Sequence, residues 1–136
     1  MKIVFIACAA KKLKKSARAK ELYISPLFKL NWQYANKLKP DRIYILSAKF
    51  GLVRPNAMLK PYNVTLNSQS AARRKTWARK VAEQLRREKI NFIKDKAIFL
   101  AGSNYYRYLA PLFKNSQLPL KGKGVGKQLK YLKANV

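Results

Sequence analysis

Three short apolar runs, separated by longer helical patterns, constrain the fold of this chain more than any other feature. The strands that they predict cover residues 2–7, 42–46 and 97–101, and turn-favouring or polar residues follow each of them. Apolar runs of this length between turn signals are typical of buried strands. Strands that alternate with helices predict an α/β fold, so we expect one three-layer domain over residues 1–136 with a mostly parallel sheet of about four strands.

Four helices are expected around this sheet. Ser25 and Pro26 form a helix-start signal, with serine as the N-cap and proline at the first helical position. The apolar face of this first helix is predicted to contain Leu27, Leu30, Tyr34 and Leu38, flanked by Phe28, Trp32 and Ala35. We expect further helices at about 69–89 and about 104–114. A short extended piece from Leu118 and three glycines then lead into the last helix.

The stretch Ile43–Asn67 is the most unusual part of the chain. Its strand ends at Leu46, and the residues from Ser47 onward open into a loop that contains two prolines. A loop of roughly twenty residues is uncommon in a compact domain and is usually functional or disordered. Apolar and aromatic residues run through this one, which argues against disorder. We therefore expect the loop to build a site, and the alternative is a packed connection without a function of its own.

Small, polar or cationic residues follow every predicted strand. Cys8 comes after the first strand, Ser47 to Lys49 after the second, and Gly102 with Ser103 after the third. In parallel α/β sheets, ligands bind outside the carboxyl ends of the strands. We therefore expect a site where these three segments meet, together with the glycines at 122 and 124 if the last extended piece joins the sheet.

The charge of the chain points to a polyanionic partner. Thirty-one Lys and Arg stand against five Asp and Glu, which leaves a net charge of +26 that must repel itself in the compact state. Nucleic acid is favoured over a membrane, because no stretch approaches the ~18 apolar residues of a spanning helix. DNA is the expected partner, with tRNA as an alternative. The candidate phosphate contacts are Lys11, Lys12, Arg73, Arg74, Arg79, Lys80, Gly122, Gly124 and Lys127.

The single cysteine excludes an internal disulfide and fits a reducing compartment, so we expect a cytoplasmic protein. The apolar run at the N-terminus is too short for a signal peptide and ends in Cys8 and two alanines before two lysines, so we interpret it as the first strand. We expect a monomer.

The residue inventory excludes several familiar chemistries. The chain has no histidine, which excludes the usual catalytic triads and histidine bases, and we expect no metal and no cofactor. The five acids are scattered, whereas two-carboxylate hydrolysis and two-metal phosphoryl transfer need them clustered. The glycines from 122 to 126 are similar to a phosphate loop, but Lys121 and Gln128 stand where the Walker sequence needs Gly and Ser or Thr.

Catalytic candidates remain at the strand ends and in the central loop. They are Lys49, Ser47, Cys8 and Asn63, and the candidate lining of a base pocket is Tyr62, Phe50, Ser103 and Tyr105. Each candidate has a simpler interpretation. Cys8 could be a nucleophile activated by nearby lysines, or a small residue at the edge of the core. Lys49 could be an amine nucleophile or a phosphate contact, and Tyr62 could stack on a base or only fix the loop.

Several motifs resemble a known family. Leu46–Pro55 together with Lys60–Asn63 is similar to the LSxxYGxLRP…PY signature of the YaaA peroxide-stress proteins. A group of small proteins resembles the chain over nearly its whole length, through the motifs LYxSPLF at 22–28, ILSAKxGL at 45–52, PYxxTL at 61–66, LAGxxY at 100–105 and PLxGxGxGxQLxxL at 119–132. The central motif is also similar to the catalytic domain of archaeosine synthases, which act on a modified base in tRNA.

The YaaA resemblance implies DNA binding and a role in limiting oxidative damage to DNA, and the tRNA relatives imply a pocket for a nucleobase. The family resemblance implies no catalytic mechanism, and the extra segments that make YaaA larger have no counterpart in these 136 residues. We expect a nucleic-acid-binding protein with a nucleobase-sized pocket, as in a base-directed repair enzyme such as a DNA glycosylase. The alternatives are a tRNA-modifying or nucleotide-binding protein, and a non-catalytic DNA-binding protein of oxidative-stress protection.

Overall fold

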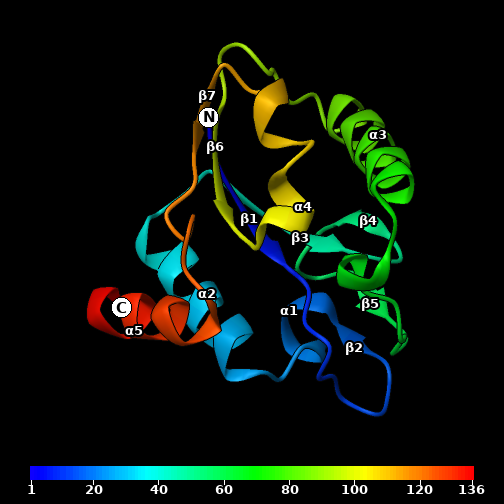
Figure 1. Cartoon of the computed structure of the whole chain (residues 1–136), viewed down its shortest axis with the longest axis vertical. Helices are drawn as coiled ribbons and strands as arrows, with labels where there is room; N and C mark the ends of the chain where they lie inside the picture. The colour runs from blue at the N-terminus through cyan, green and yellow to red at the C-terminus, as the bar shows by residue number, and fades with distance from the viewer.

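A five-stranded sheet forms the centre of the molecule. In the computed structural model, which describes residues 1–136, the strand order is β4-β3-β1-β6-β7 (Figure 1). The strands are β1 (Lys2–Ala7), β3 (Arg42–Ser47), β4 (Gly51–Val53), β6 (Lys96–Leu100) and β7 (Asn115–Gln117). Strand β1 pairs in parallel with β3 and β6, β7 is parallel to β6, and only β4 is antiparallel. The predicted α/β fold is confirmed, with five strands rather than about four because β4 folds back beside β3.

Helices cover both faces of this sheet (Figure 1). On one face, α3 (Ala71–Arg87), α4 (Ser103–Tyr106) and the 3-10 turn η2 (Ala110–Leu112) pack over a core that includes Phe5 and Phe99. On the other face, α1 (Ala19–Leu22), α2 (Pro26–Lys37) and α5 (Val125–Asn135) pack over Ile6 and Leu100. The result is the expected three-layer arrangement. No helix combines the length and the apolar character that a membrane crossing requires.

Helix α2 begins as predicted but is rotated relative to the predicted face. The Ser25 side chain accepts a hydrogen bond from the backbone N–H of Phe28 at 3.2 Å, which confirms the cap. The residues that lie flat against the core are Phe28, Asn31 and Ala35, whereas the predicted Leu27, Leu30, Tyr34 and Leu38 are only half-buried. The predicted residues flank the buried stripe because one of them, Tyr34, faces α5 and hydrogen-bonds Tyr131 at 3.2 Å.

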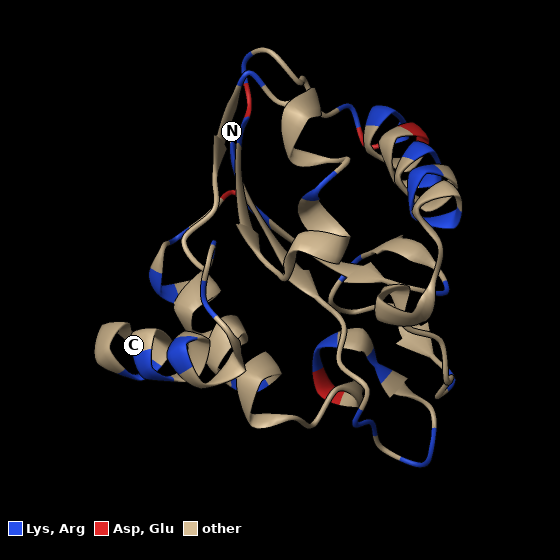
Figure 2. Ribbon diagram, viewed as in Figure 1, with Lys and Arg blue, Asp and Glu red and all other residues tan.

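Helix α3 agrees with its prediction. Ser70 caps it by accepting from the N–H of Arg73 at 3.2 Å, and Trp77, Val81 and Leu85 are buried. The remaining surface of this helix carries cations (Figure 2). In contrast, the predicted helix at 104–114 is wrong, because it is divided into α4 and η2. Pro111 has no N–H to donate to the carbonyl of Arg107, so it cannot continue the α-helical hydrogen bonds, and it lies in the first turn of η2 instead.

The central loop contains more structure than expected. Strand β4 forms a hairpin with β3, and Gly51 turns it with a φ of +75°. Farther along, β5 (Met58–Leu59) pairs with β2 (Ala17–Arg18), and the 3-10 turn η1 (Leu66–Ser68) leads toward α3. The prediction of a long loop without secondary structure is therefore wrong. The extended piece predicted from Leu118 also lies earlier, at β7, and it joins the sheet beside β6.

Candidate functional site

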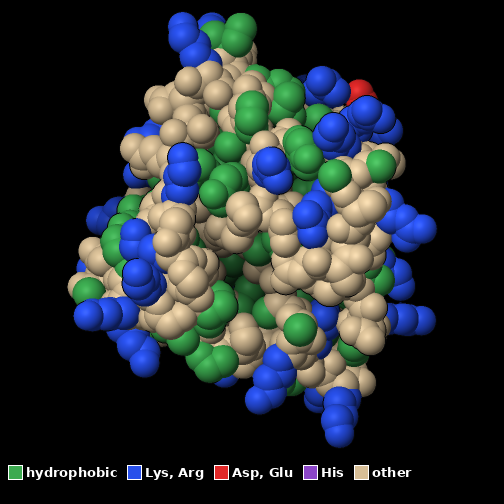
Figure 3. Space-filling model, viewed as in Figure 1, with side chains coloured by type: hydrophobic (Ala, Val, Ile, Leu, Met, Phe, Trp, Pro, Cys, Tyr) green, Lys and Arg blue, Asp and Glu red, His purple; other side chains and the backbone are tan.

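A cavity lies at the carboxyl ends of β1 and β6. Ligands bind outside the carboxyl ends of the strands in parallel α/β sheets, and we call this the strand-end rule. The volume of the cavity is about 190 Å³, below the roughly 300–1,000 Å³ of pockets for drug-sized ligands, so it suits a single heterocyclic ring system. We call it the strand-end cavity. Figure 3 shows a hollow with apolar lining near the place where these strands end in Figure 1. The lining residues are Ala7, Cys8, Ala9, Ser25, Leu27, Phe28, Asn31, Asn67, Leu100, Ala101, Gly102, Tyr105, Val125 and Gln128.

Asn31 is the most informative residue of this cavity. Its residue surface is 4% exposed, and its side-chain oxygen has no hydrogen-bond partner. Leaving a buried polar atom unpaired costs about 1–3 kcal/mol, so nearly all such atoms in folded proteins find partners. Rotating the amide by a half turn exchanges its oxygen and nitrogen but leaves a polar atom in the same buried position. Asn31 lines the cavity but its unpaired oxygen has almost no exposed surface, so a ligand would partner this amide once the side chain turns toward it.

Cys8 and Tyr105 form the polar side of the cavity. The Cys8 Sγ atom lies 3.4 Å from the Tyr105 hydroxyl, and the Tyr105 ring is edge-on to Trp77 at a centroid distance of 5.8 Å. Burial raises the pKa of Tyr105 well above its usual value, and interaction with Cys8 raises it further. The hydroxyl therefore stays protonated at neutral pH, and it can donate a hydrogen bond to a ligand or to sulfur.

Beside the cavity, hydrogen bonds join three hydroxyl groups from three segments, which we call the tyrosine cluster (Ser47, Tyr62 and Tyr23). The Ser47 hydroxyl donates to Tyr62 at 2.8 Å, and the Tyr62 and Tyr23 hydroxyls are 2.5 Å apart. Ser47 Oγ also accepts from the backbone N–H groups of Lys49 and Phe50, at 3.2 and 3.0 Å. The cluster thus attaches the central loop to the end of β3.

Lys12 places its amine over two rings of the tyrosine cluster. Its Nζ atom lies 4.4 Å from the centroid of the Tyr62 ring and 5.7 Å from that of Tyr23. Backbone hydrogen bonds from Leu13 to Leu22 and from Ile24 to Lys11 hold this segment in place. Burial lowers the pKa of Lys12, although the nearby Cys8 opposes the shift. The lysine therefore brings a positive charge to the strand ends.

The structure brings together only some of the residues predicted to form a site. Cys8 and Tyr105 line the cavity, and Ser47 and Tyr62 lie beside it in the tyrosine cluster. Phe50 contacts Tyr62 edge-on at 5.5 Å. The other three candidates, Lys49, Asn63 and Ser103, are exposed and do not line the cavity. Lys49 Nζ instead lies 5.3 Å from the centroid of the Phe50 ring.

The predicted phosphate contacts lie on the outer surface, where their role stays a prediction. Four of them have internal partners. Lys12 donates to the carbonyl of Ala10 at 3.2 Å, and Arg73 donates to the side-chain oxygen of Gln69 at 3.4 Å. The Arg74 guanidinium donates to the carbonyls of Leu66 and Asn67, at 2.8 and 3.2 Å, and Lys80 donates to the carbonyl of Lys49 at 3.3 Å. The exposed remainder comprises Lys11, Arg79, Gly122, Gly124 and Lys127.

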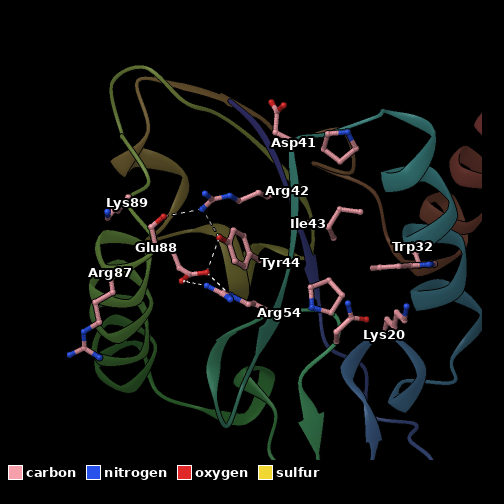
Figure 4. Close-up of a pocket in the computed structure, with 13 residues that line it drawn as sticks. Lys20, Trp32, Asp41, Arg42, Ile43, Tyr44, Arg54, Arg87, Glu88 and Lys89 are labelled. Carbon is pink, nitrogen blue, oxygen red and sulfur yellow. Dashed lines mark hydrogen bonds and ion pairs between the residues drawn. The ribbon is translucent and has the colours of Figure 1, made fainter.

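A larger cavity, which the sequence analysis missed, lies beside the first half of β3 (Figure 4). Its volume is about 910 Å³, and Glu88 is the centre of its polar contacts. Arg54 donates to both carboxylate oxygens, at 2.8 and 2.6 Å, and the Tyr44 hydroxyl donates to one of them at 3.0 Å. Arg42 donates to the Tyr44 hydroxyl and the Glu88 carbonyl. These charged groups satisfy one another, so we place the candidate site at the strand ends instead.

Alkaline titration should report the burial of the tyrosine cluster. Burial raises the pKa of Tyr23 to about 12, against about 10 for an unfolded tyrosine. Between about pH 10 and 12 the unfolded chain then binds fewer protons than the folded one, so the free energy of unfolding should fall as pH rises. We expect Tyr23→Phe to reduce this fall, as measured by denaturant unfolding at pH 9 and pH 11.

Lysines lose charge over the same pH range, which weakens their mutual repulsion and acts in the opposite direction. The comparison between Tyr23→Phe and the unsubstituted protein removes this contribution, because both carry the same lysines. Absorbance of tyrosinate at alkaline pH supplies an independent measure. An unchanged pH dependence in Tyr23→Phe would contradict the burial of a neutral hydroxyl at this position.

Comparison with protein-family models matches residues 3–134 to DUF6884, which is described as a family of unknown function. No curated protein and no solved structure matches the chain. The match covers all the elements of the strand-end cavity and of the tyrosine cluster. The resemblance to YaaA and to archaeosine synthases stays a prediction.

Proposed function

The chain belongs to the DUF6884 family, and because that family has no assigned function, we propose one from the geometry of the site: the protein binds nucleic acid, preferentially DNA, and holds one nucleobase in the strand-end cavity. The observation that carries the proposal is the unpaired, buried amide of Asn31 in a cavity of heterocycle size. The resemblance of the central loop to YaaA and archaeosine synthases supports the same class of ligand.

The surface charge supports a polyanionic partner. Of the 31 Lys and Arg, only Arg54 and Arg86 form ion pairs with a carboxylate. The other cations form no ion pair with a carboxylate, and Figures 2 and 3 show them distributed around the molecule. A phosphate backbone would supply the missing negative charge, and it would release its own condensed counterions on binding.

The cavity has the chemical character needed to hold a base. Phe28, Leu100 and Leu27 supply apolar contacts for the faces of a ring. Asn31 and Tyr105 supply hydrogen-bonding groups for its edge, which is how proteins recognise a base that has left the stack. Asparagine carries both a donor and an acceptor, and each nucleobase presents both types of group.

A base-directed reaction at this site would be hydrolysis of the N-glycosidic bond. Water would form the new bond to the sugar carbon, and the base would leave with the electron pair of the broken bond and accept a proton. None of the five acids lines the cavity, so the main contribution would be stabilisation of the departing base anion by nearby positive charge. Tyr105 lines the cavity, and Lys12 adds positive charge over the rings of the tyrosine cluster, whereas Lys49 is exposed and lies over Phe50.

Asn31→Leu tests the cavity directly. We expect the free energy of unfolding to rise by about 1–2 kcal/mol, because the substitution removes an unpaired buried polar atom. Binding of an oligonucleotide with an unpaired base should weaken by about tenfold, because the cavity loses its amide and part of its volume. The measurements are chemical denaturation and fluorescence anisotropy at constant salt concentration.

The matched control is Asn36→Leu, an exposed position on the same helix whose side chain donates to the carbonyl of Trp32. We expect this variant to keep the oligonucleotide affinity of the unsubstituted protein. Equal affinity in Asn31→Leu and Asn36→Leu would overturn the assignment of the cavity as a base site.

The reaction itself is tested with labelled DNA that carries uracil, hypoxanthine or oxidised bases, in single and double strands, followed by alkali to cleave abasic sites. Lys12→Ala and Lys49→Ala are compared with the unsubstituted protein. Cleavage at one modified base that is lost in Lys12→Ala supports a glycosylase. Salt-sensitive binding with every base intact supports a binding protein, and tRNA is then the next substrate.

A further inference from the structure

The N-terminus of α5 opens beside the strand-end cavity without a side chain to cap it. Gly124 occupies the N-cap position, and the first turn of the helix has no acidic residue. In any α-helix the first N–H groups lack an acceptor within the helix, here those of Val125, Gly126 and Lys127. Val125 and Gln128 line the cavity, so this turn lies at its margin. Residues 124–127 are all exposed.

The glycines of this segment are not required by packing. A Cβ atom added at Gly122, Gly124 or Gly126 would meet no atom within 4 Å. Only Gly122 has a left-handed backbone, with a φ of +74°. Neither space nor conformation therefore explains glycine at 124 and 126. The absence of side chains does keep the N–H groups accessible to a ligand, as in the glycine-rich turns that hold phosphates.

An anion is the ligand that this helix end favours. The partial positive charge of a helix N-terminus attracts phosphate, and Lys121 and Lys127 add exposed positive charge beside it. Lys123 is directed elsewhere, since its Nζ atom contacts the carbonyl of Pro119 at 3.4 Å and lies 5.1 Å from the Tyr131 ring. A helix end alone is a common feature, but here the unpaired, buried Asn31 lines the same cavity.

We infer that the first turn of α5 binds the phosphate of the nucleotide whose base lies against Asn31. The unit recognised at the strand ends is therefore a base together with its phosphate. This inference rests on the proposed function, which supplies the base. It adds a second contact, because the N–H groups of residues 125–127 would donate charge-assisted hydrogen bonds to the phosphate oxygens.

NMR spectroscopy on the 15N-labelled protein tests both contacts separately. The probes are the four 2′-deoxyribonucleoside 5′-monophosphates, the corresponding nucleosides and inorganic phosphate. We expect at least one monophosphate to shift both the Asn31 side-chain amide and the N–H signals of residues 125–127. The nucleoside should shift only Asn31 and should bind about tenfold more weakly. Equal affinity for nucleoside and monophosphate would overturn the inference. It would also be overturned if inorganic phosphate were the only probe to shift the signals of residues 125–127.

Gly124→Ser provides the sharpest variant. Its hydroxyl would accept from the N–H groups of the first turn, so the helix keeps or gains stability while the phosphate loses its donors. We expect about tenfold weaker binding of the monophosphate and unchanged binding of the nucleoside. Gly124→Ala is the matched control, because a methyl group fits the same open space and cannot accept a hydrogen bond. Wild-type affinity in Gly124→Ser, or an equal loss in both variants, would overturn the inference.

Oligonucleotides separate this inference from the proposed function. If they shift Asn31 and leave residues 125–127 unchanged, the base site stands and the phosphate site is wrong. If monophosphates shift both sets of signals and no oligonucleotide binds, the phosphate site stands and the proposed binding of nucleic acid is wrong.

Discussion

Gly51→Ala is expected to lower the free energy of unfolding by about 3 kcal/mol, for two reasons that add. The backbone at Gly51 is left-handed, with a φ of +75°, which costs a residue with a Cβ atom about 1–2 kcal/mol. The new methyl group would also overlap Oε1 of Gln84. That side chain accepts from the N–H of Leu52 at 2.8 Å and donates to the carbonyl of Phe50 at 3.1 Å, so moving it breaks both hydrogen bonds.

A double-mutant cycle separates the two contributions. In a Gln84→Ala background the overlap is absent, and Gly51→Ala should cost only the conformational strain of about 1–2 kcal/mol. Gly126→Ala is the control, because its Cβ would meet open space and its helical position gains about 1 kcal/mol from alanine. Denaturant unfolding measures all five proteins. An equal cost of Gly51→Ala in both backgrounds would contradict the role of Gln84.

The effect would extend to the candidate site, because Gly51 ends the turn that begins at Ser47. In that turn the Ser47 hydroxyl accepts from two backbone N–H groups and donates to Tyr62. The carbonyl of Ser47 accepts from the Trp77 indole at 2.9 Å, and Trp77 packs edge-on against Tyr105. A displaced turn would therefore disturb the wall of the strand-end cavity through the Trp77 indole.

The strands could be predicted because their apolar runs are contiguous and short. Residues 3–6 of β1 are completely buried, and residues 44–47 of β3 and 97–100 of β6 are almost equally so, which a local pattern is able to indicate. The parallel arrangement then followed from the helices between them, and the strand-end rule indicated where the site would lie. Strand β4 was missed because it has only three residues and follows a glycine turn.

The residues that face the cavity could not be predicted in the same way. The packing of α2 against the sheet and α5 determines which of its residues face the core. The leucines at 27 and 30 predicted a face that flanks the buried one. A signal for Asn31 was present, because it lies three residues after Phe28 and four before Ala35. A polar residue in the middle of an apolar stripe indicates a buried polar group whose hydrogen-bond partner must be identified.

The choice between Lys12 and Lys49 also depended on tertiary structure. Both follow a strand closely, and both carry the same charge. The segment of Lys12 pairs with the backbone at Tyr23, which directs its amine toward the rings of Tyr23 and Tyr62. Lys49 lies in the tight turn of the β3–β4 hairpin, where its side chain is exposed. Contacts with residues distant in the sequence therefore determine where each of the two amines lies.

The affinity of the protein for nucleic acid should fall steeply with salt. If the surface neutralises about six phosphates, the logarithm of the association constant should fall with the logarithm of salt concentration at a slope of about −5. Affinity would then drop by about a thousandfold between 50 and 200 mM salt. The physical reason is the release of counterions that condense on the phosphate backbone, and fluorescence anisotropy over a salt series measures the slope.

Two arginines on α3 provide a matched test of which cations contribute to this slope. Arg79 is exposed and has no hydrogen-bond acceptor within the protein, whereas Arg74 donates to the carbonyls of Leu66 and Asn67. If Arg79 contacts a phosphate, Arg79→Gln should reduce the slope by about 1 and leave the stability of the fold unchanged. Arg74→Gln should instead destabilise the fold and leave the slope nearly unchanged, because its guanidinium is already occupied. Identical slopes in all three proteins would mean that the exposed face of α3 does not contact nucleic acid.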